Sequence, residues 1–436
     1  MQRYATFRHG VHPAEHKEAT EGLPIERMRF VDEYILPLAQ HIGAPSKCLV
    51  KVGQRVERGQ MIAAAGGFIS TSLHAPVTGT VSAIEMRPHP NGKLAESIIL
   101  KTDRFDSQSS FKPVYEGADG SLPKKDAVHL VQSAGIVGLG GAAFPSHVKL
   151  SVPEGKTVRF LVLNGCECEP YLTCDHRVML EHPRKVMRGL ELIMDHLGAE
   201  RAYIGVEVNK MDAIDALRAA CTRGDIEVIP LTVKYPQGAE KALIDSVLKM
   251  AVPTGKLPLD IEIVVNNVGT AAAITDLVET GSPLIERVVT LTGPGIRRPA
   301  NVMVPLGTPL RDVIEHCGGL TSDTRQLILG GPMMGMAQKS LDVPMTKGAS
   351  GVLALTEPAN NRAEDPCIRC GRCLEACPMF LNPSRIHFLV RAERAEQAKA
   401  SHVMDCYECA SCSFVCPSNI PLAQLMKIGK AMVRQL

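Results

Sequence analysis

The stretch PCIRCGRCLEACP (residues 366–378) is followed by a second stretch of the same design, DCYECASCSFVCP (residues 405–417). Each places four cysteines at the spacing C-x2-C-x2-C-x3-C, with a proline directly behind the fourth. Such a doubled run indicates that the end of the chain is built around thiolate ligands.

This spacing is typical of bacterial ferredoxins with two 4Fe–4S clusters, in which the fourth cysteine of each run ligates the other cluster. A pair of four-cysteine zinc sites is the alternative, but zinc sites usually combine C-x2-C pairs that are well separated in sequence. The spacing therefore predicts two iron–sulfur clusters with crossed ligation. The expected ligands are Cys367, Cys370, Cys373 and Cys416 for the first cluster, and Cys406, Cys409, Cys412 and Cys377 for the second.

The composition is that of a globular protein. A chain of 436 residues should hold about three domains, and 45% apolar with 22% charged residues is ordinary for such a chain. The net charge of +2 gives no sign of a nucleic-acid-binding surface. No apolar run is long enough to span a membrane, and the polar N-terminus has no signal-peptide core. We therefore expect a location in the cytosol or on the cytosolic face of a larger structure. Thiols stay reduced there, so the 14 cysteines are expected to be ligands or core residues.

The middle of the chain predicts an α/β domain. Short apolar runs alternate with helical patterns, which favours a parallel sheet. The expected strands are 158–163, 201–207, 225–231 and 260–267, and the expected helices are 178–197, 210–222 and 238–250.

A glycine-rich loop precedes this sheet. Gly138, Gly140 and Gly141 follow a helical pattern at 124–135 rather than a strand, so the loop does not fit the Rossmann dinucleotide motif. Ligands bind parallel sheets at the carboxyl ends of the strands. Asparagines stand at two such ends, and together with the loop and a nearby lysine they predict a flavin or nucleotide pocket. These polar residues are Asn164, Asn266, Asn267 and Lys149.

Three other segments have sequence patterns that predict a type of structure. The first hundred residues contain two glycine-rich hairpin halves similar to biotinyl or lipoyl carrier domains, but no lysine occurs between Lys51 and Lys93. Phe68-Ile69-Ser70 stands where the modified lysine would be, so we expect a docking or structural role rather than a carrier function. Residues 287–330 predict a small β-grasp-like unit, and residues 382–401 predict helix between the two cysteine runs.

The segments GLGGAAFPSHVK (138–149) and NGCECEP (164–170) resemble the NADH- and FMN-binding subunit of respiratory complex I. YPQGAEKALI (235–244) and VNNVGT (265–270) continue the resemblance. With TFRHGVHPAEHKEAT near the start and the cysteine runs at the end, nearly the whole chain resembles the RnfC family, the C subunits of Rnf-type ion-translocating electron transport complexes.

The resemblance implies a multidomain α/β protein. Its parts would be a carrier-like β domain, a Rossmann-like FMN/NADH domain, a β-grasp (soluble-ligand-binding) module and a helical two-cluster ferredoxin-like domain. The expected ranges are 1–105, 120–275, 284–345 and 360–436.

The resemblance also assigns roles. Gly138, Gly140, Gly141, Lys149, Asn164, Asn266 and Asn267 would hold non-covalent FMN, with the lysine near the phosphate. Phe144 would stack on the NADH adenine, and Glu169 and Glu240 would contact the dinucleotide, Glu240 from the flavin site.

The implied activity is that of an NADH-dependent flavin and iron–sulfur oxidoreductase subunit. Its implied partners are the iron–sulfur and membrane subunits of an ion-pumping NADH:ferredoxin complex, on the cytoplasmic face of the bacterial cell membrane.

The sequence departs from the complex I pattern at Cys166, where an aspartate is expected, at Ala239, where a glutamate is expected, and at Val152, where an aromatic is expected. Cys166, Cys168 and Cys174 are expected to be core or pocket-lining thiols. Two other functions stay open: a soluble reductase of the cobalamin-reductase type, which typically lacks the N-terminal domain, and a non-catalytic iron–sulfur wire.

Overall fold

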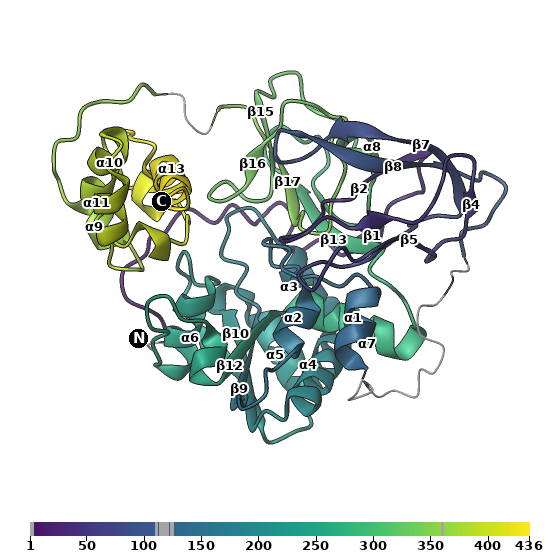
Figure 1. The fold of residues 1–436 in the computed structure, drawn as a ribbon, viewed down its shortest axis with the longest axis horizontal. Coiled ribbons are helices and arrows are strands. Elements are labelled where there is room, and N and C mark those ends of the chain that lie inside the picture. Colours follow the sequence, from purple (N-terminus) through teal and green to yellow (C-terminus); the bar gives the residue numbers. More distant parts are fainter. Residues whose placement is uncertain (1–3, 110–111, 113–121, 123–125, 359–361) are drawn as a thin grey trace.

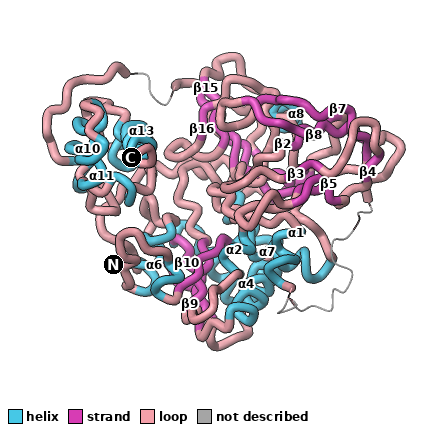
Figure 2. The backbone as a smooth tube through the Cα atoms, viewed as in Figure 1, coloured by secondary structure: helices cyan, strands magenta, loops and turns pink. Residues whose placement is uncertain are grey.

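The computed structural model describes residues 4–109, 112, 122, 126–358 and 362–436, whose elements are labelled in Figure 1. The expected domain starts at 120 and 360 and the expected helix start at 124 fall outside the described residues. Figure 2 shows how the secondary structure differs between parts of the chain. The part that contains β2–β8 (residues 33–102) consists of strands and loops, the part that contains β9 and β10 (residues 160–164 and 201–207) mixes helices and strands, and the C-terminal part consists of helices and loops. Among the described helices, none combines the length and apolar character needed to cross a bilayer.

Residues 33–102 form two small antiparallel sheets, with strand orders β2-β8-β7-β4 and β3-β5-β6. Val81, Ile98 and Leu100, on the longest strand pair, are fully buried. The expected β domain is confirmed as an architecture. Its strands are β2 (Glu33–Pro37), β3 (Lys47–Cys48), β4 (Arg55–Val56), β5 (Met61–Ala64), β6 (Leu73–His74), β7 (Gly79–Pro88) and β8 (Leu94–Thr102).

The tip of this β unit lies against two helices of the neighbouring unit, α1 (Ala127–Ser133) and α2 (Ser146–Leu150). Gln132 on α1 donates hydrogen bonds of 3.0 Å to the carbonyls of Gly67 and Ser70. His147 on α2 lies 2.7 Å from the Phe68 carbonyl. The tip where a carrier would present its lysine is therefore used for docking.

The α/β unit is built on a parallel sheet of order β11-β10-β9-β12, as expected. Its strands are β9 (Phe160–Asn164), β10 (Arg201–Glu207), β11 (Ile226–Leu231) and β12 (Ile263–Asn267). Its other elements are α3 (Cys174–Glu181), α4 (Pro183–Leu197), η1 (Val208–Lys210), α5 (Met211–Ala220), α6 (Glu240–Leu248), η2 (Pro258–Ile261) and α7 (Val268–Thr280).

Two predicted elements of this unit were wrong in extent. The helix expected at 178–197 is two helices, because Pro183 cannot continue α3 and instead starts α4 at its first position. The strand expected at 260–267 begins only at Ile263, because η2 comes first and Glu262 has a left-handed φ of 60°.

The next unit is a six-stranded mixed sheet of order β1-β14-β13-β17-β15-β16, with α8 packed on it. The sheet extends past the expected end at residue 345, because β17 lies inside it, between β13 and β15. Its elements are β1 (Ile25–Arg27), β13 (Glu286–Thr292), β14 (Ala300–Pro305), α8 (Leu310–His316), β15 (Gln326–Leu329), β16 (Met336–Ala337) and β17 (Gly351–Leu355).

Residues 4–27 lie outside the two antiparallel sheets of the β unit. Ala5 forms a bridge with Leu231 at the edge of the parallel sheet, and β1 pairs in parallel with β14. The N-terminal segment therefore runs across the other units and ties them together (Figure 1).

The C-terminal unit is helical, and its helices pack around buried apolar side chains such as Ile386 and Met426. The helical stretch expected at 382–401 is interrupted near Glu393, which has a φ of 56°. The helices are α9 (Arg372–Ala376), α10 (Pro383–Arg391), α11 (Ala395–Ala400), η3 (Val403–Asp405), α12 (Ser411–Phe414) and α13 (Leu422–Val433).

Candidate functional site

The glycine-rich loop lies over the start of α7 at the carboxyl end of the parallel sheet. The Gly138 N–H donates to the Phe144 carbonyl at 2.8 Å, and the Leu139 N–H donates to the Thr270 hydroxyl at 2.9 Å. Gly141 has a φ of 103°, and a Cβ added there would meet open space. The loop thus presents backbone to a free region, as a phosphate-binding loop must.

The asparagines lie beside this loop. Asn267 is paired with Asn164 across β12 and β9, and a Cβ on Gly140 would lie 3.4 Å from the Asn267 amide nitrogen. Asn267 also caps α7 through a hydrogen bond of 2.8 Å from the Gly269 N–H. The structure therefore brings the glycine loop and both strand ends together.

Asn266 is only 4% exposed, and its side-chain nitrogen has no hydrogen-bond partner within the described residues. A buried amide without a partner is costly unless a ligand or water satisfies it. This orphaned donor fits a pocket that receives a polar cofactor such as FMN.

Lys149 on α2 and Glu240 at the start of α6 meet at the same end of the sheet. The Lys149 ammonium donates to the Glu240 carboxylate at 2.8 Å and to the Val265 carbonyl at 2.8 Å. An ammonium group has three donors, so one remains for an anion such as a phosphate.

The two residues expected to contact NADH are differently placed. Phe144 is half-buried on the glycine loop. The Glu169 carboxylate accepts hydrogen bonds from the backbone N–H groups of Met333 (3.0 Å) and Met334 (2.8 Å), in the loop after β15. Burial raises the pKa of Glu169 to about 7 despite these bonds. In this structure Glu169 is thus a contact between two units.

The thiols in the turn after β9 have no common partner among the described residues. Cys166 is buried, and Cys168 accepts a 3.3 Å hydrogen bond from the Gly238 N–H. Cys174, at the start of α3, lies with Glu167 and Asp175 in a tight group.

Sequence reasoning missed Glu167, Asp175 and Lys17. Lys17 is 5% exposed and donates to the carbonyls of Glu167 (2.8 Å), Glu169 (3.1 Å) and Leu172, so it shapes the turn. An aspartate in the first turn of a helix near a strand end was the available signal for Asp175. Lys17 carried no local signal, because its partners are about 150 residues away.

Cysteines of both runs line one cavity of the C-terminal unit. This cavity is lined by Cys377 together with Cys406, Cys409 and Cys412. Cys373 of the first run is close enough to Cys416 of the second for their charges to interact. Four thiols around one space fit the ligand set of an iron–sulfur cluster.

The C-terminal unit is attached to the α/β unit beside this cavity. The Tyr235 hydroxyl donates to the Cys409 carbonyl at 2.8 Å, and the Gly10 N–H donates to the Ala376 carbonyl at 3.2 Å. Three residues after Tyr235, the Gly238 carbonyl accepts a 2.8 Å hydrogen bond from Asn164. One turn therefore contacts both a candidate flavin residue and a candidate cluster ligand.

Four family models match the chain in this order. They are described as RnfC Barrel sandwich hybrid domain (residues 5–105), Nuo51 FMN-binding domain (131–276), SLBB domain (288–337) and 4Fe-4S dicluster domain (364–420).

Two relatives from bacteria are similar over most of their length. The C subunit of the proton-translocating ferredoxin:NAD(+) oxidoreductase complex of Clostridium ljungdahlii is 44% identical, over 91% of this chain and 87% of the relative. The C subunit of the ion-translocating oxidoreductase complex of Rhodobacter capsulatus is 40% identical, over 99% and 83%.

A solved structure shares the fold at low sequence identity. A chain of an NAD+-reducing NiFe-hydrogenase in the H2-reduced state superposes with a TM-score of 0.50 at 18% identity. The match covers 74% of this chain and 65% of the hydrogenase chain.

Proposed function

Because this chain belongs to the family of C subunits of ion-translocating ferredoxin:NAD(+) oxidoreductase (Rnf-type) complexes, we propose that it carries electrons between NADH, FMN and two 4Fe–4S clusters. The flavin supplies the exchange between a two-electron hydride carrier and one-electron carriers. The match to the RnfC N-terminal model favours this function over a soluble cobalamin-type reductase.

The flavin residues of the proposal are those at the carboxyl end of the parallel sheet. The glycine loop faces open space at Gly141, Lys149 makes two of its three possible hydrogen bonds to described residues, and the side-chain nitrogen of Asn266 has no partner among them. Asn164 and Asn267 hold the turn and the helix start that border this space. Phe144, Glu169 and Glu240 remain the proposed NADH contacts.

The proposed clusters are held by crossed cysteine groups, and their positions suggest an order of electron transfer. The group with Cys377 and Cys409 adjoins the α/β unit through Tyr235. Cys370 of the other group is exposed. The cluster nearer the flavin would exchange electrons with it, and the outer cluster would exchange them with a partner.

The single observation that carries this proposal is the turn from Tyr235 to Gly238, which touches Cys409 at one end and Asn164 at the other. In the complex, the chain would work with iron–sulfur and membrane subunits, as a peripheral subunit on the cytoplasmic face of the membrane.

Anaerobic purification with flavin, iron and sulfide analysis tests the proposal. We expect one FMN and about eight iron atoms per chain, and we expect NADH to bleach the flavin absorbance. Stoichiometric zinc with little iron would contradict the clusters. Clusters without flavin would leave only an iron–sulfur wire.

A further inference from the structure

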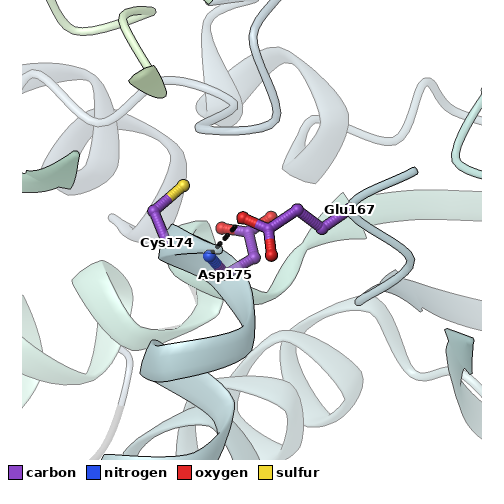
Figure 3. A group of neighbouring side chains, drawn as sticks. All are labelled: Glu167, Cys174 and Asp175. Atoms are coloured by element: carbon purple, nitrogen blue, oxygen red, sulfur yellow. Dashed lines mark hydrogen bonds between the residues drawn. The ribbon is translucent and has the colours of Figure 1, made fainter. Parts of the chain in front are cut away.

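Two carboxyl groups meet at the border of the proposed flavin pocket. The side-chain ligand atoms of Glu167, Cys174 and Asp175 all lie within 4.8 Å of one another, and Figure 3 shows the two carboxyl groups facing each other. Glu167 comes from the turn after β9, while Asp175 stands in the first turn of α3.

Glu167 is the member of the pair that the backbone at the start of α3 holds in place. Its two oxygens accept hydrogen bonds from the backbone N–H groups of Asp175 (2.7 Å) and His176 (3.1 Å), at the N-terminus of α3. Hydrogen bonds to the charged form and the positive end of a helix both stabilise the negative charge.

Asp175 is the member that can take up a proton. It accepts one hydrogen bond, of 2.7 Å from the Asn267 side chain, and it faces the charge of Glu167. Burial and that charge raise the pKa of Asp175 to about 7, against the opposing effects of Asn267, Arg287 and Lys210. The thiols of Cys166 and Cys174 also face it.

The side chain of Asn267 connects Asp175 to the proposed flavin pocket. The Asn267 nitrogen that donates to Asp175 is the atom that would lie 3.4 Å from a Cβ added to Gly140 of the glycine loop. Arg287 touches the same loop, because it donates to the Leu139 carbonyl at 3.1 Å. The charge of Asp175 is therefore close to whatever the loop holds.

We propose that Asp175 is a proton-holding residue of the flavin pocket, coupled to it through Asn267 and kept from permanent ionisation by Glu167. This inference rests on the proposed function. When electrons enter the pocket, the added negative charge raises the proton affinity of Asp175. Its carboxylate then binds one proton from solvent to give the neutral acid, and it releases that proton when the electrons leave. No other bond changes.

Asp175→Asn tests this inference, because the amide oxygen can still accept from Asn267 while the titratable group is lost. We expect FMN to remain bound and the midpoint potential of the flavin to depend less steeply on pH between about 6 and 8. The potential should exceed that of the parent protein at pH 8 and approach it at pH 6, where the parent Asp175 is also neutral.

Two further variants sharpen the experiment. Glu167→Gln removes the negative charge beside Asp175, so Asp175 should lose its proton at lower pH. The pH range in which the flavin potential falls steeply should therefore move to lower pH. Asp212→Asn is the matched control, because Asp212 is half-exposed and its carboxylate lies 2.8 Å from the His176 ring. In this variant the dependence of the flavin potential on pH should be the same as in the parent protein.

Flavin-free protein gives a readout that needs no redox chemistry. The folded state holds the Asp175 proton up to about pH 7 and the unfolded state only to about 4, so this group lowers stability as pH rises between these values. Asp175→Asn should flatten that decline. An unchanged stability profile together with an unchanged potential profile would overturn the inference, whereas a parent protein without FMN would instead overturn the proposed function.

Discussion

The Tyr235 hydroxyl donates a 2.8 Å hydrogen bond to the backbone carbonyl of Cys409, across the contact between the α/β unit and the C-terminal unit. Tyr235 is 1% exposed and Cys409 is also buried, so water is not available as an alternative hydrogen-bond partner for the hydroxyl or the carbonyl. Its backbone also pairs with Val11 of the N-terminal segment, which fixes the turn from the other side. The Tyr235 phenol is thus one of the contacts that fix the cavity of the inner cluster relative to the α/β unit.

Tyr235→Phe keeps the ring and removes the hydroxyl. The Cys409 carbonyl then loses its partner in a buried place, which should cost about 1–3 kcal/mol of stability. We expect slower electron transfer from flavin to the clusters in rapid-mixing experiments, with iron and FMN contents unchanged.

Tyr203→Phe is the control for this change, because Tyr203 lies on β10 and packs against Phe160. It should leave the transfer rate as it was. Equal rates in the parent protein and in the Tyr235 variant would show that the contact has no part in electron transfer.

Cys377→Ala should damage the cluster of the other cysteine run, because Cys377 lines one cavity with Cys406, Cys409 and Cys412. Anaerobic iron analysis and EPR should show loss of that cluster and retention of the other. Cys221→Ala, which changes a thiol in the α/β unit, should keep about eight iron atoms. If only the signal of the Cys367 cluster changed, ligation would not be crossed.

Lys149→Met should weaken FMN binding. The ammonium has one donor left beyond Glu240 and Val265, and a lost charge-assisted contact to phosphate costs about 1–3 kcal/mol, or about 5-fold to 150-fold in Kd. Fluorescence titration of flavin-free protein with FMN measures this. Lys156→Met, which breaks the surface ion pair with Asp260, should bind FMN normally.

The local patterns of the sequence were sufficient for the parallel sheet and for the grouping of the cysteines into two runs, because both depend on short spacings. Local patterns were insufficient for strands that form only through contacts with residues far away in the sequence. β1 has only three residues, and it becomes a strand because β14, far along the chain, offers an open edge. Likewise β17 looks like a linker until it inserts between β13 and β15.

The same distinction holds at the site. The glycine loop and the strand-end asparagines follow from local pattern, since the carboxyl ends of parallel strands collect ligands. For Asp175 the local pattern offers only an acidic residue in the first turn of a helix, because Asn267 and Glu167, which set its surroundings, reach it only in the folded chain.

Glu169→Gln should change how stability depends on pH. The pKa of Glu169 is about 7 in the folded chain against an ordinary value of 4.5, so the folded state binds more protons between these values. Glu169 therefore lowers the free energy of unfolding as pH rises from about 4.5 to 7, by about 3 kcal/mol at most. Chemical denaturation at several pH values should show a flatter profile for the variant.

The control here is Glu154→Gln, at an exposed position, whose profile should follow that of the parent. Since Asp175 is present in all three proteins, differences between them report Glu169 alone. A parent-like slope in the Glu169 variant would mean that the carboxylate stays ionised against Met333 and Met334.

The NADH contact of Phe144 is the last prediction. Phe144 is half-buried on the glycine loop and is followed by Pro145, which favours an extended backbone at Phe144. If the ring stacks on adenine, Phe144→Ala should raise the KM for NADH and leave bound FMN and the melting temperature close to those of the parent.

A core phenylalanine would behave otherwise, because its truncation costs about 3–5 kcal/mol and would release flavin as the fold weakens. Phe144→Leu separates the two: a core position should tolerate it better than alanine, whereas a stacking position should lose NADH affinity with either residue. An unstable, flavin-poor alanine variant with unchanged KM would place Phe144 in the core.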